Sequence, residues 1–215
     1  MENGGLEFPF VWKAAQFGYD GQGVKVVRNL DVLTYPVVEM EFHPEANQVE
    51  YVICPARIDE KVAKKATEIA LEVSKKMKHI GILAVEMFQT KDDQILVNEV
   101  APRPHNSGHY SIEASYTNQF EQHIRAILSL PLGSTESKVA GIMVNLVGAE
   151  GYTGDVVYEN METILKLEGV TPHIYGKKQT RPFRKMGHVT IVNKDISVAR
   201  KIAQKVKETI KVISK

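Results

Sequence analysis

The chain has 215 residues, a net charge of +1, 43% hydrophobic residues and 25% charged residues. This balance predicts a soluble globular protein of one or two domains, without the basic surface typical of nucleic-acid-binding proteins. No apolar run approaches the length of a membrane span and the first residues lack a secretory signal pattern, so we expect no membrane association and a cytoplasmic location.

Two short strands are predicted near the start of the chain, "FPFVWK" and "VKVV", on either side of the glycine-rich segment "GYDGQG". Glycine lets backbone N–H groups approach an anion closely, so Gly18, Gly21 and Gly23 form a candidate phosphate cradle, with Lys13 as a nearby positive charge. The lysine and hydroxyl of a P-loop are absent after the last glycine. An ordinary glycine-rich hairpin turn therefore stays an open alternative.

The next segment, residues 28–42, passes from the start of a possible helix into a strand with little turn chemistry between them. Leu33 and Thr34 mark this seam. Residues 35–42 and 48–53 then predict a hairpin joined by the turn "HPEAN".

A helix is predicted from Asp59, a suitable N-cap, because apolar residues recur after it at helical spacing. Before it, Cys54 lies in the apolar run "YVICPA", where we expect it to fill the core rather than to act as a nucleophile. After the helix, residues 81–90 and 92–100 predict the two strands of a second hairpin.

Helical spacing of apolar residues also predicts one helix from Ser111 to Leu130. A linker rich in Pro, Gly and Ser follows, and we place a domain boundary after residue 133. Beyond the boundary the patterns predict a strand over 139–148, a helix over 159–168, a strand over 172–176 and a last helix from Ile196 to Ile213.

Two carboxylates stand out in the second predicted hairpin. Glu86 lies in the middle of the apolar strand "AVEMF", and Glu99 lies at the end of its predicted partner, after Asn98. A glutamate in such a strand lies on the solvent face or is paired. If the hairpin brings all three side chains to one edge, their oxygen atoms suit Mg²⁺ that bridges substrate phosphates.

A rigid polar loop follows this hairpin. The segment "NEVAPRPHNSGH" places Arg103, His105, Asn106 and Ser107 around two prolines, which remove backbone donors and fix φ. Ordinary connecting loops share this composition. The position between a strand and a helix favours a site, because open α/β sheets commonly place ligand groups there.

A basic cluster follows the strand over 172–176. Two arginines and a proline within it favour phosphate recognition, although a solvated charged face is the common alternative. Nearly no aromatic residues interleave, so a small phosphorylated substrate fits better than nucleic acid. The basic residues are Lys177, Lys178, Arg181, Arg184 and Lys185.

The stretch "VNEVAPRPHNSGHYSIEASYTNQFEQHIRAILSLPLGS" closely resembles the signature of the N5-carboxyaminoimidazole ribonucleotide synthetases, ATP-grasp enzymes of purine biosynthesis. Six further segments resemble the same family and occur along the chain in the family's order: "GYDGQG", "YPVVEMEFH", "ICPARI", "GILAVEMF", "GIMVNLVG" and "YGKKQTRPFRKMGHV". The resemblance implies an α+β fold: a lid remnant over 1–33, the ATP-grasp central domain over 34–133 and a small mixed β/α domain over 134–215.

The resemblance also implies an activity. The family uses ATP to convert bicarbonate to carboxyphosphate on Mg²⁺, after which the amine of aminoimidazole ribonucleotide captures the activated carbon dioxide. By this resemblance Glu86, Asn98 and Glu99 hold Mg²⁺. The remaining implied contacts are Lys13, Gly18, Gly21 and Gly23 with the ATP phosphates, Arg103, His105, Asn106 and Ser107 with bicarbonate and the imidazole, Tyr19 and Asp20 with the substrate, and Lys177 and Arg184 with the ribonucleotide phosphate.

The chain departs from the family pattern in three places. Gln22 stands where the family usually has a basic residue, the family's N-terminal domain has no counterpart, and a helix and two strands are missing at the seam. We therefore expect this chain alone to be inactive. The family forms dimers, so the resemblance implies a homodimer; another ATP-grasp ligase and a non-catalytic binding or dimerisation module stay open.

Overall fold

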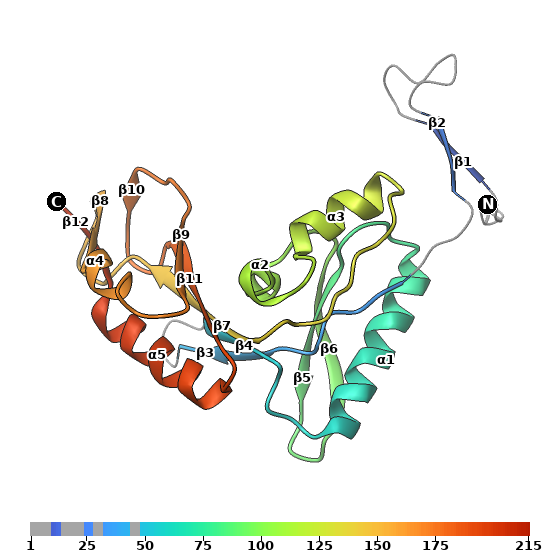
Figure 1. Ribbon diagram of the computed structural model, residues 1–215, viewed down its shortest axis with the longest axis horizontal. Helices are drawn as coiled ribbons and strands as arrows, with labels where there is room; N and C mark the ends of the chain where they lie inside the picture. Colours follow the sequence, from blue (N-terminus) through green and yellow to red (C-terminus); the bar gives the residue numbers. More distant parts are fainter. Residues whose placement is uncertain (1–9, 14–23, 28–31, 44–47) are drawn as a thin grey trace.

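The computed structural model describes residues 10–13, 24–27, 32–43 and 48–215 of the chain (Figure 1). The first half holds β1 (Phe10–Lys13), β2 (Val24–Val27), β3 (Glu39–Phe42), β4 (Val49–Cys54), α1 (Glu60–Met77), β5 (Ala84–Gln89), β6 (Ile95–Ala101), a 3₁₀ turn (Asn106–Gly108), α2 (Ser111–Ala114) and α3 (Gln119–Ile127). The second half holds β7 (Ala140–Val147), β8 (Gly154–Glu159), α4 (Met161–Ile164), β9 (Val170–Ile174), β10 (Gln179–Thr180), β11 (Lys185–Asn193), α5 (Ile196–Thr209) and β12 (Lys211–Ser214).

A five-stranded antiparallel sheet, β3-β4-β7-β11-β9, forms the centre of the molecule. Tyr51 and Ile53 on β4 pack toward α5, whereas Val52 and Cys54 pack toward α2 on the opposite face. This period of two explains why the whole run is apolar, since both faces are covered. The expected burial of Cys54 is confirmed.

The same sheet crosses the boundary that we predicted after residue 133. Strands β3 and β4 precede that position, and β7, β9 and β11 follow it, yet all five belong to one hydrogen-bonded sheet. The two predicted domains therefore share a core. Tyr110, at the end of the polar loop over 102–110, and Ala114 of α2 pack against Val52, Cys54 and Met143 of this sheet.

A second layer contains α1 and the two-stranded β5–β6 hairpin (Figure 1). The predicted helix begins as expected, because the carboxylate of Asp59 accepts a hydrogen bond from Lys61 N at 2.8 Å. A cavity of about 1310 Å³ lies between α1, β5, α3 and residues 32–38. Within the described ranges no helix is long and apolar enough to cross a membrane.

Three predicted helices are wrong in extent. The helix predicted from Ser111 to Leu130 is split, because Asn118 caps a new helix by accepting hydrogen bonds from Phe120 N and Glu121 N, both at 3.0 Å. The last helix ends at Thr209 instead of Ile213. The strand β12, which the sequence pattern did not predict, follows it and pairs with β8. The helix predicted over 159–168 is only the four residues of α4.

Candidate functional site

The two carboxylates of the second hairpin lie directly opposite each other. Glu86 on β5 is the register partner of Glu99 on β6, so both side chains project from one face of the hairpin. A β-bulge follows, because Met87 pairs with Val97 and leaves Asn98 as the extra residue on β6. A bulge places two residues opposite one and re-aims their side chains. Asn98 and Glu99 together therefore oppose Glu86.

These residues suit Mg²⁺ shared with phosphate groups rather than a cage made by the protein alone. Among the residues that the structure describes, no three His, Cys, Asp or Glu side chains converge as a metal site. Mg²⁺ is commonly bound by one or two carboxylates, with substrate phosphates and waters completing its octahedron. Two opposed carboxylates and a neighbouring carboxamide fit that requirement.

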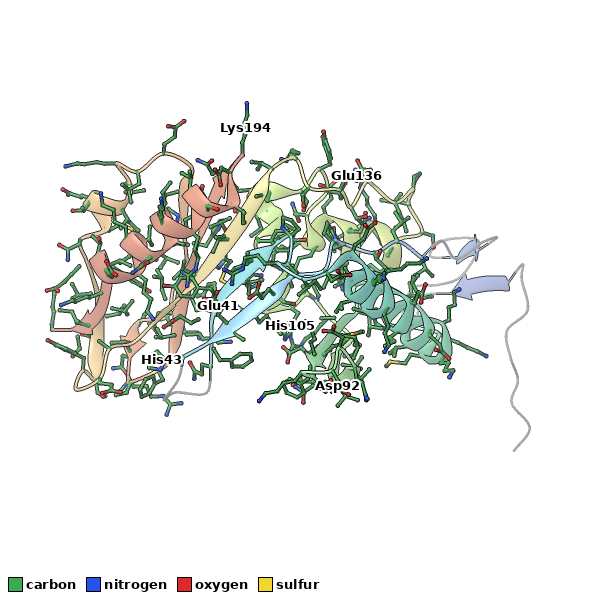
Figure 2. All side chains as sticks on the ribbon, turned by 90° about the horizontal axis from the view of Figure 1, so that it is seen from below. Glu41, His43, Asp92, His105, Glu136 and Lys194 are labelled. Carbon is green, nitrogen blue, oxygen red and sulfur yellow. The ribbon has the colours of Figure 1, made fainter. Side chains whose placement is uncertain are left out.

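His105 lies beside Glu86, with its Nε2 at 3.5 Å from Glu86 Oε1; Figure 2 labels His105 in the middle of the molecule. Its Nδ1 lies 3.0 Å from the hydroxyl oxygen of Ser107, which can donate, and 3.4 Å from Ser107 N, which can only donate. The proton of the neutral ring therefore sits on Nε2 and faces the carboxylate. Burial lowers the pKa of His105, and the positive charges of Arg103 and Lys185 lower it further, against the opposing effect of Glu86 and Glu99.

The polar loop is held by two buried carboxamides. Gln119 on α3 accepts a hydrogen bond from His105 N at 2.9 Å and donates one to His105 O at 2.8 Å. Asn106 and Asn145 on β7 donate to each other, at 2.9 and 3.1 Å. Asn106 therefore ties the loop to the sheet, and its predicted contact with bicarbonate would require a further free lone pair or N–H of that carboxamide.

A stack of imidazoles adjoins this loop. The ring of His109 stacks on His188 at 4.7 Å between centroids, and His188 stacks on His173 at 4.4 Å. Burial lowers the pKa of His109 to about 4 and that of His188 to about 3. His105 and His173 lower the pKa of His109 further, and His109 and His173 lower that of His188. His173 is the last ring of the stack, and its Nε2 lies 2.8 Å from Glu113 Oε1. The rings of His109 and His188 are therefore neutral near pH 7.

The C-terminal basic cluster reaches this site through a residue that we had not assigned. Lys185, at the start of β11, is half-buried, and burial lowers its pKa while Glu86 raises it. Lys177 and Arg184 bond to backbone carbonyls instead, Lys177 Nζ to Lys185 O at 2.6 Å and Arg184 Nη1 to Gln179 O at 2.8 Å. Sequence patterns placed Lys185 in the cluster but gave no reason to prefer it.

Several predicted site residues occupy less informative positions. Arg103 is exposed and donates to Pro104 O at 3.1 Å, while Ser107 lines the large cavity together with Glu86, Asn98 and His105. Lys13 is the last residue of β1; the two predicted strands β1 and β2 are present and pair antiparallel. Five predicted residues lie outside the described ranges: Gly18, Tyr19, Asp20, Gly21 and Gly23.

Two family models match the chain in succession. The ATP-grasp domain matches residues 30–120, and the phosphoribosylaminoimidazole carboxylase C-terminal domain matches residues 141–202. The N5-carboxyaminoimidazole ribonucleotide synthase of Bacillus subtilis is 36% identical over 224 residues, covering 87% of this chain and 57% of the relative. This chain belongs to the N5-carboxyaminoimidazole ribonucleotide synthetase family.

Solved structures of this synthetase family agree with the fold. The N5-carboxyaminoimidazole ribonucleotide synthetase of Thermotoga maritima has a TM-score of 0.75 and 44% identity, covering 97% of this chain and 64% of that one. The synthase of Aspergillus clavatus, solved in complex with ADP and 5-aminoimidazole ribonucleotide, has a TM-score of 0.73 and 34% identity, covering 82% of this chain and 47% of that one.

The chain spans about half the length of the curated relatives it matches. It covers 57% of the B. subtilis synthase, 42% of the phosphoribosylaminoimidazole carboxylase of Schizosaccharomyces pombe and 56% of the Synechococcus elongatus synthase. The alignment with the B. subtilis synthase has 224 positions, whereas the matched 87% of this chain is part of only 215 residues. Some aligned positions of the relative therefore face gaps in this chain. That relative therefore carries residues within the matched region that this chain lacks. A gap at the seam of Leu33 and Thr34 remains a prediction for where they are missing.

Proposed function

We propose that this chain takes part in the ATP-dependent carboxylation of 5-aminoimidazole ribonucleotide with bicarbonate, which yields N5-carboxyaminoimidazole ribonucleotide in purine biosynthesis. The opposed pair of Glu86 and Glu99, with the imidazole of His105 beside it, carries the proposal. The names of the relatives support the substrate, because the Aspergillus synthase was solved with ADP and this ribonucleotide. The proposed ligands are ATP, Mg²⁺, bicarbonate and the ribonucleotide.

In this proposal Glu86, Glu99 and Asn98 would hold Mg²⁺. The bound metal ion would neutralise phosphate charge while bicarbonate is phosphorylated. His105 presents its Nε2–H as a neutral donor to an oxygen of the carboxyphosphate, and Lys185 adds positive charge nearby. A donor fixed in a half-buried site stabilises developing negative charge without reorganising at the moment of reaction.

The remaining contacts follow the family pattern. Lys177 and Arg184 would exchange their present carbonyl partners for the ribonucleotide phosphate, which Arg binds in a bidentate manner. Tyr19 and Asp20 would reach the substrate, and Lys13 with the glycine loop would contact the ATP phosphates. A homodimer stays a prediction that sedimentation of the chain tests.

Ligand-induced thermal stabilisation tests the proposal with the chain itself, because any ligand that binds the folded state raises Tm. We expect Mg·ATP to raise Tm of the wild type, and Glu99→Gln to lose most of that rise. Glu68→Gln, which changes an exposed glutamate on α1, is the matched control and should keep it. An equal rise in Glu99→Gln and wild type would contradict the assigned metal site.

A second titration identifies the acyl acceptor. We expect 5-aminoimidazole ribonucleotide to raise Tm more than ribose 5-phosphate does at equal concentration, because only the former offers the imidazole to the polar loop. Stabilisation by Mg·ATP with equal effects of the two phosphates would favour another ATP-grasp ligase. Stabilisation by neither nucleotide nor ribonucleotide would favour a non-catalytic module.

A further inference from the structure

We propose that Gln119 is a positioning residue of the site, which fixes the backbone of His105 and the proton of His109. Its role in catalysis rests on the function proposed above, but its effect on His109 does not. Gln119 escaped the sequence patterns, since a glutamine in a helix gives no apolar signal. In the structure Gln119 is 3% exposed, and both the oxygen and the nitrogen of its carboxamide form hydrogen bonds.

The orientation of the Gln119 carboxamide follows from the backbone that it contacts. His105 N can only donate, so the group facing it at 2.9 Å is the oxygen Oε1. His105 O can only accept, so the group facing it at 2.8 Å is the nitrogen Nε2. The two ends cannot be exchanged without losing both hydrogen bonds.

The proton of His109 then follows. Gln119 Nε2 also lies 2.8 Å from His109 Nδ1, and an amide nitrogen only donates. His109 Nδ1 must therefore accept, which leaves the proton of the neutral ring on Nε2. One side chain thus sets both the position of the loop at His105 and the tautomer at His109.

The close approach depends on two small residues. A side chain at position 108 would collide with the carboxamide of Gln119, so the loop can lie this close only because residue 108 is glycine. Ser111 completes the arrangement, since its hydroxyl donates to Gly108 O at 2.5 Å and accepts from Gln119 N at 3.0 Å. Loop and helix are therefore joined by both the side chain and the backbone of Gln119.

The surroundings of His109 oppose its protonation. His188 stacks on one side, and Phe120 and Tyr175 lie 5.7 and 6.4 Å away between ring centroids. Burial lowers the pKa of His109, and His105, His173 and Lys185 lower it further; none of these three groups, nor the neighbouring His188 and Tyr175, carries a carboxylate. A carboxylate in place of the Gln119 amide would add a negative charge beside His109 Nδ1.

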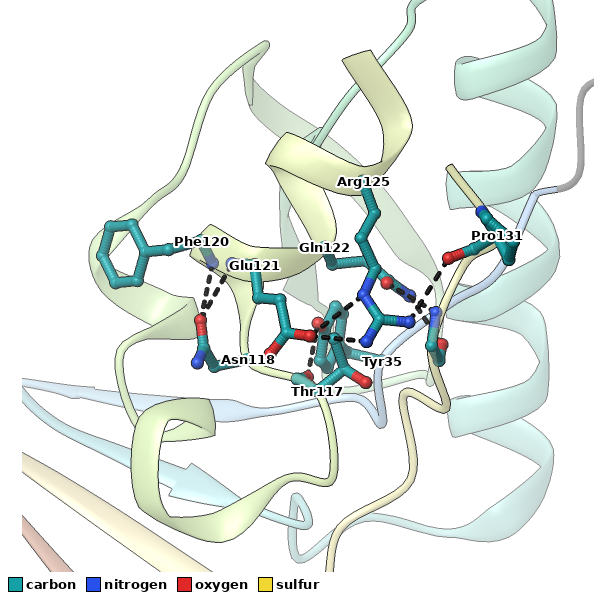
Figure 3. A network of polar contacts seen from close by, with 9 residues as sticks. Tyr35, Thr117, Asn118, Phe120, Glu121, Gln122, Arg125 and Pro131 are labelled. Atoms are coloured by element: carbon teal, nitrogen blue, oxygen red, sulfur yellow. Dashed lines mark hydrogen bonds and ion pairs between the residues drawn. The ribbon is translucent and has the colours of Figure 1, made fainter. Parts of the chain in front are cut away.

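The chain supplies its own matched control. Gln122, one turn further along α3 and 4% exposed, bonds a backbone in the same way, donating to Gly133 O at 2.7 Å and accepting from Gly133 N at 2.9 Å. Figure 3 shows Gln122 turned toward the linker near Pro131, below Arg125. Gln122 thus shares the burial and the bonding of Gln119 but contacts no histidine through these bonds.

The ¹⁵N NMR signals of the imidazoles test the inference without any turnover. In the wild type we expect His109 as the Nε2–H tautomer at pH 7, its signals assigned by their loss in His109→Asn. In Gln119→Glu we expect a proton on Nδ1 and a pKa of His109 about one unit higher or more, because a carboxylate accepts and stabilises the imidazolium. Gln122→Glu should leave the His109 signals unchanged.

Two results would overturn the inference. One is an Nδ1–H tautomer of His109 in the wild type, which needs no variant to fold. The other is an unchanged tautomer and pKa of His109 in a folded Gln119→Glu. Loss of ligand stabilisation in the wild type would overturn the proposed function instead, and would leave the His109 result standing.

Discussion

At the scale of single residues, the site combines charges that sequence patterns expose with buried polar groups that they hide. Glu86 and Glu99 were predictable, because a carboxylate in an apolar strand breaks the pattern and a hairpin has a countable register. Gln119 was not, since its worth lies in hydrogen bonds to a backbone 14 residues away. Hydrophobic periodicity cannot indicate a buried polar side chain that is fully bonded.

The neutral histidines make stability depend on pH in a definite direction. In the unfolded chain His109 and His188 bind protons below about pH 6.5, whereas burial lowers their folded pKa values to about 4 and about 3. The unfolded state therefore binds more protons between these limits, and stability falls as pH falls from 6.5 toward 4. At pH 5 each of these two histidines lowers the free energy of unfolding by at most about 2 kcal/mol relative to pH 8.

Replacing His188 tests this dependence. In urea titrations at pH 7.5 and pH 5, His188→Asn should show a smaller loss of unfolding free energy between the two values than the wild type, by about 1–2 kcal/mol. His79→Asn, which changes a histidine outside the stack, should match the wild type. Equal losses in His188→Asn and the wild type would contradict a neutral stack.

At the scale of elements, α3 shows why boundaries and faces differed from the pattern. Phe120 and Ile124 were predicted to form its apolar face, yet their exposed fractions are 43% and 49%. The buried face of α3 instead includes Gln119 and Gln122. Helical spacing correctly indicated the buried residues Val62 and Ala66 of α1 and the α5 residues that pack in the core. It was wrong for α3, whose buried glutamines bond to loop backbone.

The cap that splits this helix should matter measurably. Asn118 accepts hydrogen bonds from two backbone N–H groups at the start of α3, so Asn118→Ala should lower the free energy of unfolding by about 1 kcal/mol. Asn118→Asp keeps an acceptor and should retain most of the stability. Urea denaturation measures the free energy of unfolding of both variants. An equal loss in Asn118→Ala and Asn118→Asp would show that the acceptor oxygen at this position contributes little to stability.

The bulge in β6 makes a sharper prediction about the site. Deleting Asn98 would let Glu99 and Val97 pair with Glu86 and Met87 in a regular ladder, so the hairpin should survive with a similar Tm. Stabilisation by Mg·ATP should nevertheless fall, because the oxygen ligand and the re-aimed geometry are lost. Asn98→Ala, which keeps the bulge, separates the two causes: a smaller fall than in the deletion assigns the difference to geometry.

At the scale of the whole molecule, the predicted α+β fold is confirmed, with an ATP-grasp part followed by a C-terminal domain of the phosphoribosylaminoimidazole carboxylase type. The sharing of one sheet between the predicted domains could not be foreseen, because β4 and β7 pair across about ninety residues and no local pattern encodes such a contact. The cavity between α1, β5 and α3 was equally hidden, since α1 has an ordinary amphipathic sequence.

Because of that cavity, we expect an alanine-to-phenylalanine substitution to change the free energy of unfolding in opposite directions on α1 and on α5. Ala70 on α1 lines the cavity, whereas Ala203 on α5 is fully buried in the core of the five-stranded sheet. Ala70→Phe can place its ring in open apolar space and should raise the free energy of unfolding by about 0.5–2 kcal/mol. Ala203→Phe must displace packed atoms and should lower it by about 1–3 kcal/mol.

Thermal and urea denaturation give the two signs, and fluorescence of the apolar dye ANS gives an independent reading of the cavity. We expect the wild type to bind the dye, Ala70→Phe to bind less, and a folded Ala203→Phe to bind no less than the wild type. A destabilised Ala70→Phe with unchanged dye binding would mean that α1 and the β5–β6 hairpin close upon each other in solution.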